Sequence, residues 1–153
     1  MELRSKLQAA TKEAMKARDT ARLSTLRLIG AAVKDREIAA RGGDGDGALT
    51  EADLIAILSR MVKQRQESAK AYEEAGRLEL ASKEEDEITV IQEFLPRQMT
   101  ADETRAAIDK AISDLNAEGI RDMGRVMAAL KERHAGQMDF GAVGPAVKDR
   151  LLA

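Results

Sequence analysis

The chain has 153 residues, of which 34 % are charged and 2 % aromatic, and its formal net charge is −2. It is rich in Ala, Leu, Glu, Lys and Arg, which suit helices, whereas strands favour β-branched and aromatic residues. The absence of cysteine excludes disulfides, thiolate metal sites and cysteine nucleophiles. The composition therefore predicts an all-α protein.

Two patterns bear on location and partners. The first residues lack the apolar core of a secretory signal peptide, and nowhere do 18 apolar residues follow one another. We therefore expect a soluble, cytoplasmic protein with no membrane partner.

The small net charge argues against a general nucleic-acid binder, and no DNA partner is expected. However, residues 1–41 carry ten cations and five anions, a net +5, while residues 77–95 carry two cations and six anions, a net −4.

Four segments between residues 2 and 95 carry apolar residues at helical spacing. Asp19 or Thr20 caps the second of them, and Thr50 with Asp53 forms a capping box at the start of the third. The third ends near Gly76, a residue common at helix C-termini. GGDGDG at 42–47 predicts a flexible loop. The predicted helices span residues 2–17, 20–41, 50–75 and 77–94.

Pro96 marks the boundary of a second module, because proline disfavours helical geometry in the residue before it. Thr100 and Glu103 then form another capping box, and a helix over 101–116 is followed by two short ones around 123–130 and after 139. Each apolar stripe is too small to be stable alone, so the three helices are expected to bury one another. The predicted organisation is an N-terminal helical bundle or hairpin module, 1–95, and a small three-helix C-terminal module, 97–153. Pro145 predicts an irregular start of the last helix.

Several residues along the chain could in principle form a chemical site. A calcium loop starting at Asp44 would have Ala48, Leu49 and Ile55 at positions that need other residues, so a plain loop is predicted. The single histidine, His134, is expected to cap a helix or to be partly buried. The carboxylates of residues 84–87 point in diverging directions on a helix, which favours a solvated face. The sequence thus predicts no catalytic residue, no metal site and no cofactor.

Three long stretches carry a family resemblance: RLSTLRLIGAAVKDREIAARG, KQRQESAKAYEEAGRLELASKEEDEITVIQEFLPRQMT and DMGRVMAALKERHAGQMDFGAVGPAVKDRL. With them the chain resembles the YqeY family over essentially its whole length, broken mainly at GGDGDG. That family is similar to the C-terminal helical and tail modules of the GatB subunit of glutamine-dependent aminoacyl-tRNA amidotransferase.

The resemblance implies a two-part all-α fold divided at Leu95–Pro96, and a link to tRNA or to the amidation of misacylated tRNA. It implies no catalysis, because the larger GatB portion that activates the substrate with nucleotide and metal is absent. An amidase-type Ser/Lys site is also missing from the sequence.

The first hypothesis is a non-catalytic module that contacts the tRNA backbone through cations. Tyr72 is the only candidate for base stacking outside the core, so single-strand recognition is not expected. One alternative is an accessory subunit, partnered by amidotransferase subunits, of a carbon–nitrogen ligase with glutamine as amido-N-donor. Another is a protein–protein adaptor that docks through the acidic helix 77–95 or an apolar groove between the modules. The predicted RNA-binding residues are Lys12, Lys16, Arg18, Arg22, Arg27, Lys131, Arg133, Lys148 and Arg150.

Overall fold

The structure, a computed structural model, describes residues 2–42 and 48–153. The predicted loop and the calcium loop considered at Asp44 lie largely outside the described residues. Every regular element in the described ranges is a helix, which confirms the all-α fold class. The chain divides into two compact units, Met1–Leu95 and Pro96–Ala153. The predicted division into an N-terminal module, 1–95, and a C-terminal module, 97–153, stays a prediction.

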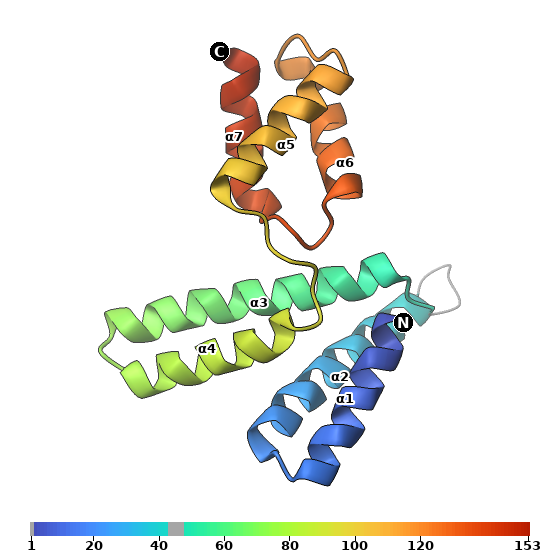
Figure 1. Cartoon of the computed structure of the whole chain (residues 1–153), viewed down its shortest axis with the longest axis vertical. Coiled ribbons are helices and arrows are strands. Elements are labelled where there is room, and N and C mark those ends of the chain that lie inside the picture. Colours follow the sequence, from blue (N-terminus) through green and yellow to red (C-terminus); the bar gives the residue numbers. More distant parts are fainter. Residues whose placement is uncertain (1, 43–47) are drawn as a thin grey trace. The chain divides into compact units, whose positions relative to one another are not determined.

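Unit 1 consists of two helical hairpins, which Figure 1 shows in blue and green. Helix α1 packs against α2, and α3 packs against α4. Contacts of α2 with α3 and α4, and of α1 with α3, join the two hairpins. The helices are α1 (Leu3–Ala17), α2 (Thr20–Arg41), α3 (Glu51–Glu74) and α4 (Leu78–Gln92).

A tight turn connects α1 to α2. Arg18 adopts the left-handed conformation, with φ 56° and ψ 34°. The N–H of Asp19 donates to the carbonyl of Ala14 at 3.1 Å, and the N–H of Arg18 donates to that of Met15 at 3.2 Å. These two bonds form a Schellman motif. The Asp19 carboxylate also accepts the Arg22 N–H at 3.2 Å, so the predicted cap of α2 is confirmed for Asp19.

The predicted capping box of α3 is confirmed. The N–H of Asp53 donates to Thr50 Oγ1 at 3.1 Å, and the Thr50 N–H donates to Asp53 Oδ2 at 2.9 Å. The Thr50 N–H lowers the pKa of the Asp53 carboxyl, because it stabilises the charged form. At the other end, Gly76 takes φ +73° and ends the helix, as the sequence predicts.

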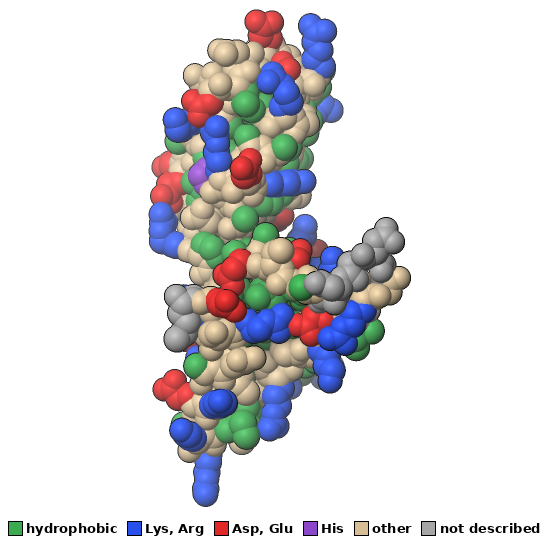
Figure 2. Space-filling view, turned by 90° about the vertical axis from the view of Figure 1, so that its right-hand side faces the viewer, with side chains coloured by type: hydrophobic (Ala, Val, Ile, Leu, Met, Phe, Trp, Pro, Cys, Tyr) green, Lys and Arg blue, Asp and Glu red, His purple; other side chains and the backbone are tan. Residues whose placement is uncertain are grey.

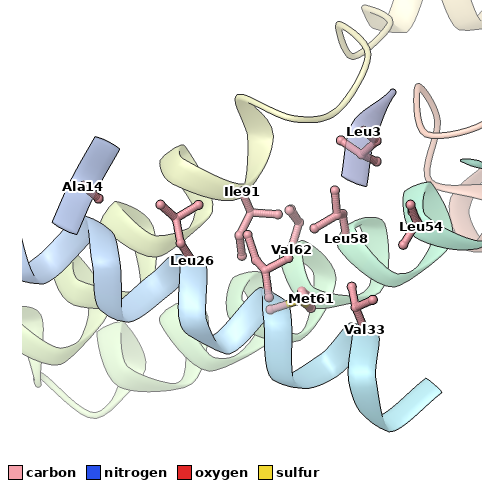
Figure 3. Close-up of a cluster of buried hydrophobic side chains, with 10 residues drawn as sticks. Leu3, Ala14, Leu26, Val33, Leu54, Leu58, Met61, Val62 and Ile91 are labelled. Atoms are coloured by element: carbon pink, nitrogen blue, oxygen red, sulfur yellow. The ribbon is translucent and has the colours of Figure 1, made fainter. Parts of the chain in front are cut away.

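The core of unit 1 lies where the four helices meet. Charged side chains are spread over the face seen in Figure 2, whereas Figure 3 shows apolar side chains from all four helices pointing toward one another. Leu58 and Ile91 are fully buried, and Leu26 is 3 % exposed. The sequence also predicts an inward Leu78, and this is wrong: Leu78 is 65 % exposed. It is the first residue of α4, beside the α3–α4 turn, where no other helix covers it.

Unit 2 is a bundle of three short helices, and each pair of them is in contact. Ile108, Val126, Leu130 and Val147 are at most 1 % exposed and form one cluster. This confirms that the three helices bury one another. A short 3₁₀ turn before the second helix is an addition that the sequence analysis missed. The elements are α5 (Ala101–Asp114), η1 (Ile120–Asp122), α6 (Met123–Arg133) and α7 (Phe140–Leu152).

The last helix differs from expectation at its start. The sequence predicts irregularity around residues 140–145, but α7 runs as a continuous helix from Phe140 through Pro145. Proline at this position withholds one backbone N–H from the helix. The residue whose carbonyl would receive it, Gly141, is exposed, as is Pro145. Water can therefore satisfy that carbonyl, and the helix continues.

The segment before α5 is tied to the α6–α7 connection. The Met99 N–H donates to the Gln137 carbonyl at 3.0 Å, and Gln137 Nε2 donates to the Arg97 carbonyl at 3.2 Å. The predicted capping box of α5 is confirmed, since Thr100 and Glu103 exchange two bonds of 3.0 and 3.1 Å. Unit 2 therefore has an ordered entry into its first helix.

Candidate nucleic-acid interface

The α1–α2 hairpin carries the predicted cations of unit 1. Lys12 and Lys16 stand one helical turn apart on α1, and both are exposed. Arg18 lies in the turn and Arg27 on α2, again exposed. Among residues 2–42 and 48–153, none of these four makes an ion pair. Lys and Arg side chains gather at the lower end of Figure 2, over the hairpin turn.

The fifth predicted residue of unit 1 has a different environment. Arg22 Nη1 pairs with the Glu93 carboxylate at the end of α4, 71 residues away in sequence. Its side chain is 30 % exposed. Arg22 therefore links the two hairpins, and a phosphate would have to compete with Glu93 for its guanidinium. Its RNA-binding role stays a prediction.

Unit 2 holds the other four predicted residues. Arg133 Nη1 on α6 lies 3.0 Å from Asp114 Oδ2, and Arg150 Nη2 on α7 lies 2.6 Å from Asp109 Oδ1. Both pairs connect a later helix to α5. Lys131 and Lys148 are exposed and make no ion pair within the described part of the chain. The RNA-binding role of these four residues is also untested and stays a prediction.

The acidic segment of α4 is only partly the solvated face that the sequence predicts. Glu85 and Asp86 are exposed, but Glu87 pairs with Arg65 of α3, and the two side chains are 18 % and 15 % exposed. The Nε–Oε2 distance is 2.9 Å, and Arg65 Nη1 also donates to the Met61 carbonyl at 3.2 Å. Periodicity could not reveal this pair, because its partners lie 22 residues apart on different helices.

Two further candidates have structural positions. His134 is half-buried at the C-terminal cap of α6. Its backbone N–H donates to the Leu130 carbonyl at 2.9 Å, so the predicted capping position is confirmed. Tyr72 is half-buried on α3. Among the residues that the structure describes, no group of three or more His, Asp or Glu side chains could hold a metal ion. The same residues contain no helix that is long and apolar enough to span a lipid bilayer.

Comparison with known proteins gives a family match and several relatives. A family model described as Yqey-like protein matches residues 4–151. The chain is 34 % identical over 112 residues to "Altered inheritance of mitochondria protein 41, mitochondrial" of Lachancea thermotolerans, a match that covers 73 % of this chain and 57 % of the relative. The protein of the same name from Eremothecium gossypii is 31 % identical over 150 residues, which cover 96 % of this chain and 79 % of that protein.

A third relative of that name, from Vanderwaltozyma polyspora, is 32 % identical over 111 residues, covering 71 % of this chain and 58 % of its own length. The chain thus spans less than two thirds of two of these relatives. Their names contradict the cytoplasmic location expected from the sequence, and that expectation is wrong. It rested on the lack of an apolar leader, which argues only against a secretory signal, since mitochondrial targeting segments are amphipathic.

Proposed function

The chain belongs to the family of Yqey-like proteins, and on that premise we propose that it is a non-catalytic helical module that binds tRNA. The contact surface is the α1–α2 hairpin, defined by Lys12, Lys16, Arg18 and Arg27. One observation carries the proposal: these four cations are exposed on one short hairpin and make no ion pair among the described residues. Each is therefore available to a phosphate.

The chemistry of the hairpin suits structured RNA. Double-stranded RNA is recognised largely through shape and through phosphate and ribose contacts, which cations supply without aromatic side chains. Such contacts release counterions, so binding weakens steeply as salt rises. The local net charge of +5 over residues 1–41 supports this role although the whole chain carries −2. The resemblance to amidotransferase modules extends the proposal to tRNA-dependent amidation, in which partner subunits would hold the chemistry.

Filter binding of tRNA at several salt concentrations tests the proposal. The double variant Lys12→Gln/Lys16→Gln is expected to bind more weakly at low salt and to lower the slope of log affinity against log salt by about two, one for each phosphate contact. Lys70→Gln, which removes an exposed charge from α3, is the matched control and should leave the slope unchanged. No detectable binding by the unaltered protein at low salt would rule the proposal out.

The accessory role in amidation has its own test. Adding the protein to purified amidotransferase subunits is expected to raise their turnover on misacylated tRNA, and the Lys12→Gln/Lys16→Gln variant should raise it less. Unchanged turnover together with intact tRNA binding would restrict the proposal to RNA binding alone.

A further inference from the structure

Helices α1 and α2 leave a groove between them that no described element of unit 1 fills. It has a volume of about 540 Å³. Its apolar lining residues include Leu7 of α1, Leu26, Ile29 and Val33 of α2, and Leu54 of α3. The lining is therefore apolar over most of its length, although the hairpin that forms it is rich in charge.

The groove is open where α2 passes Gly30. A Cβ built on Gly30 would meet no heavy atom within 4 Å, so this wall has free space into which a partner side chain can enter. On the α1 side, Met15 stands one turn after the lining residue Thr11, on the same side of the helix. Met15 is 53 % exposed, and it prolongs the apolar surface toward the α1–α2 turn.

The rim of the groove is positive. Arg4 on α1 pairs with Glu37 on α2 at 2.7 Å, so the one carboxylate among the described lining residues is already neutralised. Lys12 and Lys34 line the groove from α1 and α2 respectively. Both are exposed and make no ion pair in the ranges 2–42 and 48–153. An occupant of the apolar floor therefore meets a cation on either side.

We propose that the α1–α2 groove binds an acidic amphipathic helix of a partner protein. Helices that dock into apolar grooves do so through anchors at i, i+3 or i+4, and i+7. Arg4 and Lys12 lie eight residues apart on α1, which corresponds to about 12 Å or two helical turns. This length accepts one such set of anchors. Carboxylates flanking the anchors would face Lys12 and Lys34.

The floor distinguishes this ligand from RNA. Leu26, Ile29 and Val33 are already buried beneath the groove, whereas Leu7 is half-buried and Met15 is 53 % exposed. Apolar anchors would remove Leu7 and Met15 from water, and phosphate and ribose gain nothing from covering them. A docked helix would lie against both α1 and α2 and form a three-helix arrangement with them. The proposal does not depend on tRNA binding, although Lys12 serves both surfaces.

The test uses two synthetic helical peptides and the full chain. Both peptides carry Leu at i, i+4 and i+7; one has Glu on both flanks and the other has Lys at the same positions. Fluorescence anisotropy is expected to show that the Glu peptide binds about tenfold more tightly or better, because only its charges complement the rim. Equal binding of the two peptides, or no binding of the Glu peptide, would overturn the proposal.

Two matched variants locate the binding. Gly30→Leu fills the groove and should weaken binding of the Glu peptide about tenfold or more, while Leu is also the better helix former, so the fold is retained. Ala31→Leu adds the same side chain at an exposed position that does not line the groove and should bind as the parent does. Circular dichroism checks that both variants keep the helix content of the parent.

Other occupants would appear as specific results. Sedimentation in which the parent chain is a dimer and Gly30→Leu is a monomer would assign the groove to a second copy and overturn the proposal. A loss of tRNA affinity in Gly30→Leu that matches the loss of peptide affinity would assign the groove to RNA and also overturn it. Unchanged tRNA binding by Gly30→Leu, with peptide binding lost, supports the proposal.

Discussion

Arg18 holds an unusual backbone conformation at the tip of the hairpin proposed to bind RNA. Its φ of 56° lies in the left-handed region, which costs a residue with a Cβ about 1–2 kcal/mol. Glycine is the usual residue at this position of a Schellman motif. The turn therefore combines a cation with strain that glycine, which has no Cβ, would remove, and this permits a test that separates stability from binding.

We expect Arg18→Gly to raise the free energy of unfolding by about 1 kcal/mol, because relief of the strain exceeds the extra entropy that glycine adds to the unfolded chain. The same variant should bind tRNA more weakly, since one phosphate contact is lost. Urea unfolding and filter binding measure the two effects.

Arg18→Ala is the matched control, because it removes the charge and keeps the strain. It should bind tRNA as weakly as Arg18→Gly but should lack the gain in stability. Asn116, at φ 51° after α5, is a second comparison: asparagine tolerates this region better than most residues, so Asn116→Gly should gain less. A variant Arg18→Gly no more stable than Arg18→Ala would contradict the strain argument.

The stability of helix α5 depends on a charged cap at its N-terminus. The Glu103 carboxylate accepts bonds from Arg97 Nη1 and Nη2, at 3.0 and 2.8 Å, and from the Thr100 N–H at 3.0 Å. The Arg97 hydrogen bond, followed by that of the Thr100 backbone, lowers the pKa of Glu103 from its ordinary 4.5 to about 2. Because the folded pKa lies below the unfolded one, the charged cap stabilises α5 fully above about pH 4.5. That contribution is lost as the pH falls toward 2.

Thermal unfolding followed by circular dichroism between pH 6 and pH 2 should therefore show a fall in the melting temperature below about pH 4.5. Glu103→Gln should weaken this fall, because a neutral side chain at the cap does not titrate. Glu132→Gln, on the exposed side of α6, is the control and should retain it. The explanation fails if Glu103→Gln and the parent lose stability equally across this range.

The starts of helices could be predicted where the residues that define them are close together in sequence. Thr50 and Asp53, like Thr100 and Glu103, lie three residues apart, so each capping box can be read before any tertiary contact is known. Leu78 was misassigned because helical spacing identifies the apolar side of a helix but not how far its neighbour extends. The same periodicity could not foresee η1, a single turn too short to show a repeat.

The candidate interface was predictable only in part, for the same reason. Counting charges finds Lys12 and Lys16, but it cannot separate free cations from paired ones. Arg22, Arg133 and Arg150 meet carboxylates that lie 71, 19 and 41 residues away in sequence. Only tertiary packing brings residues so far apart in sequence into contact. The groove beside Gly30 was missed because it depends on how α1 and α2 are spaced.

The two units of the protein have separate cores. The buried cluster of unit 1 draws on α1 to α4, and that of unit 2 on α5 to α7, without a shared residue. Chains of about 60 residues bury a smaller fraction of their surface than longer ones and are only marginally stable. Unit 2 is the smaller of the two, so we expect it to unfold first.

Fragments 1–95 and 97–153 should each be helical in circular dichroism and melt cooperatively, the second at the lower temperature. The full chain should then unfold in two steps near the temperatures of the fragments. A fragment 97–153 that is unstructured, together with a single transition of the full chain, would show that the units fold as one.

Tyr72 is the chain's only tyrosine, and there is no tryptophan. Its place on α3 makes the protein's native ultraviolet emission a signal from unit 1 alone. Unit 1, which carries both proposed binding surfaces, thus has an intrinsic chromophore, whereas unit 2 contains no tyrosine or tryptophan and gives no tyrosine emission. Tyrosine emission recorded on an unlabelled sample therefore follows unit 1, while far-ultraviolet ellipticity on the same sample records the helices of both units. A step seen in ellipticity but not in emission belongs to unit 2.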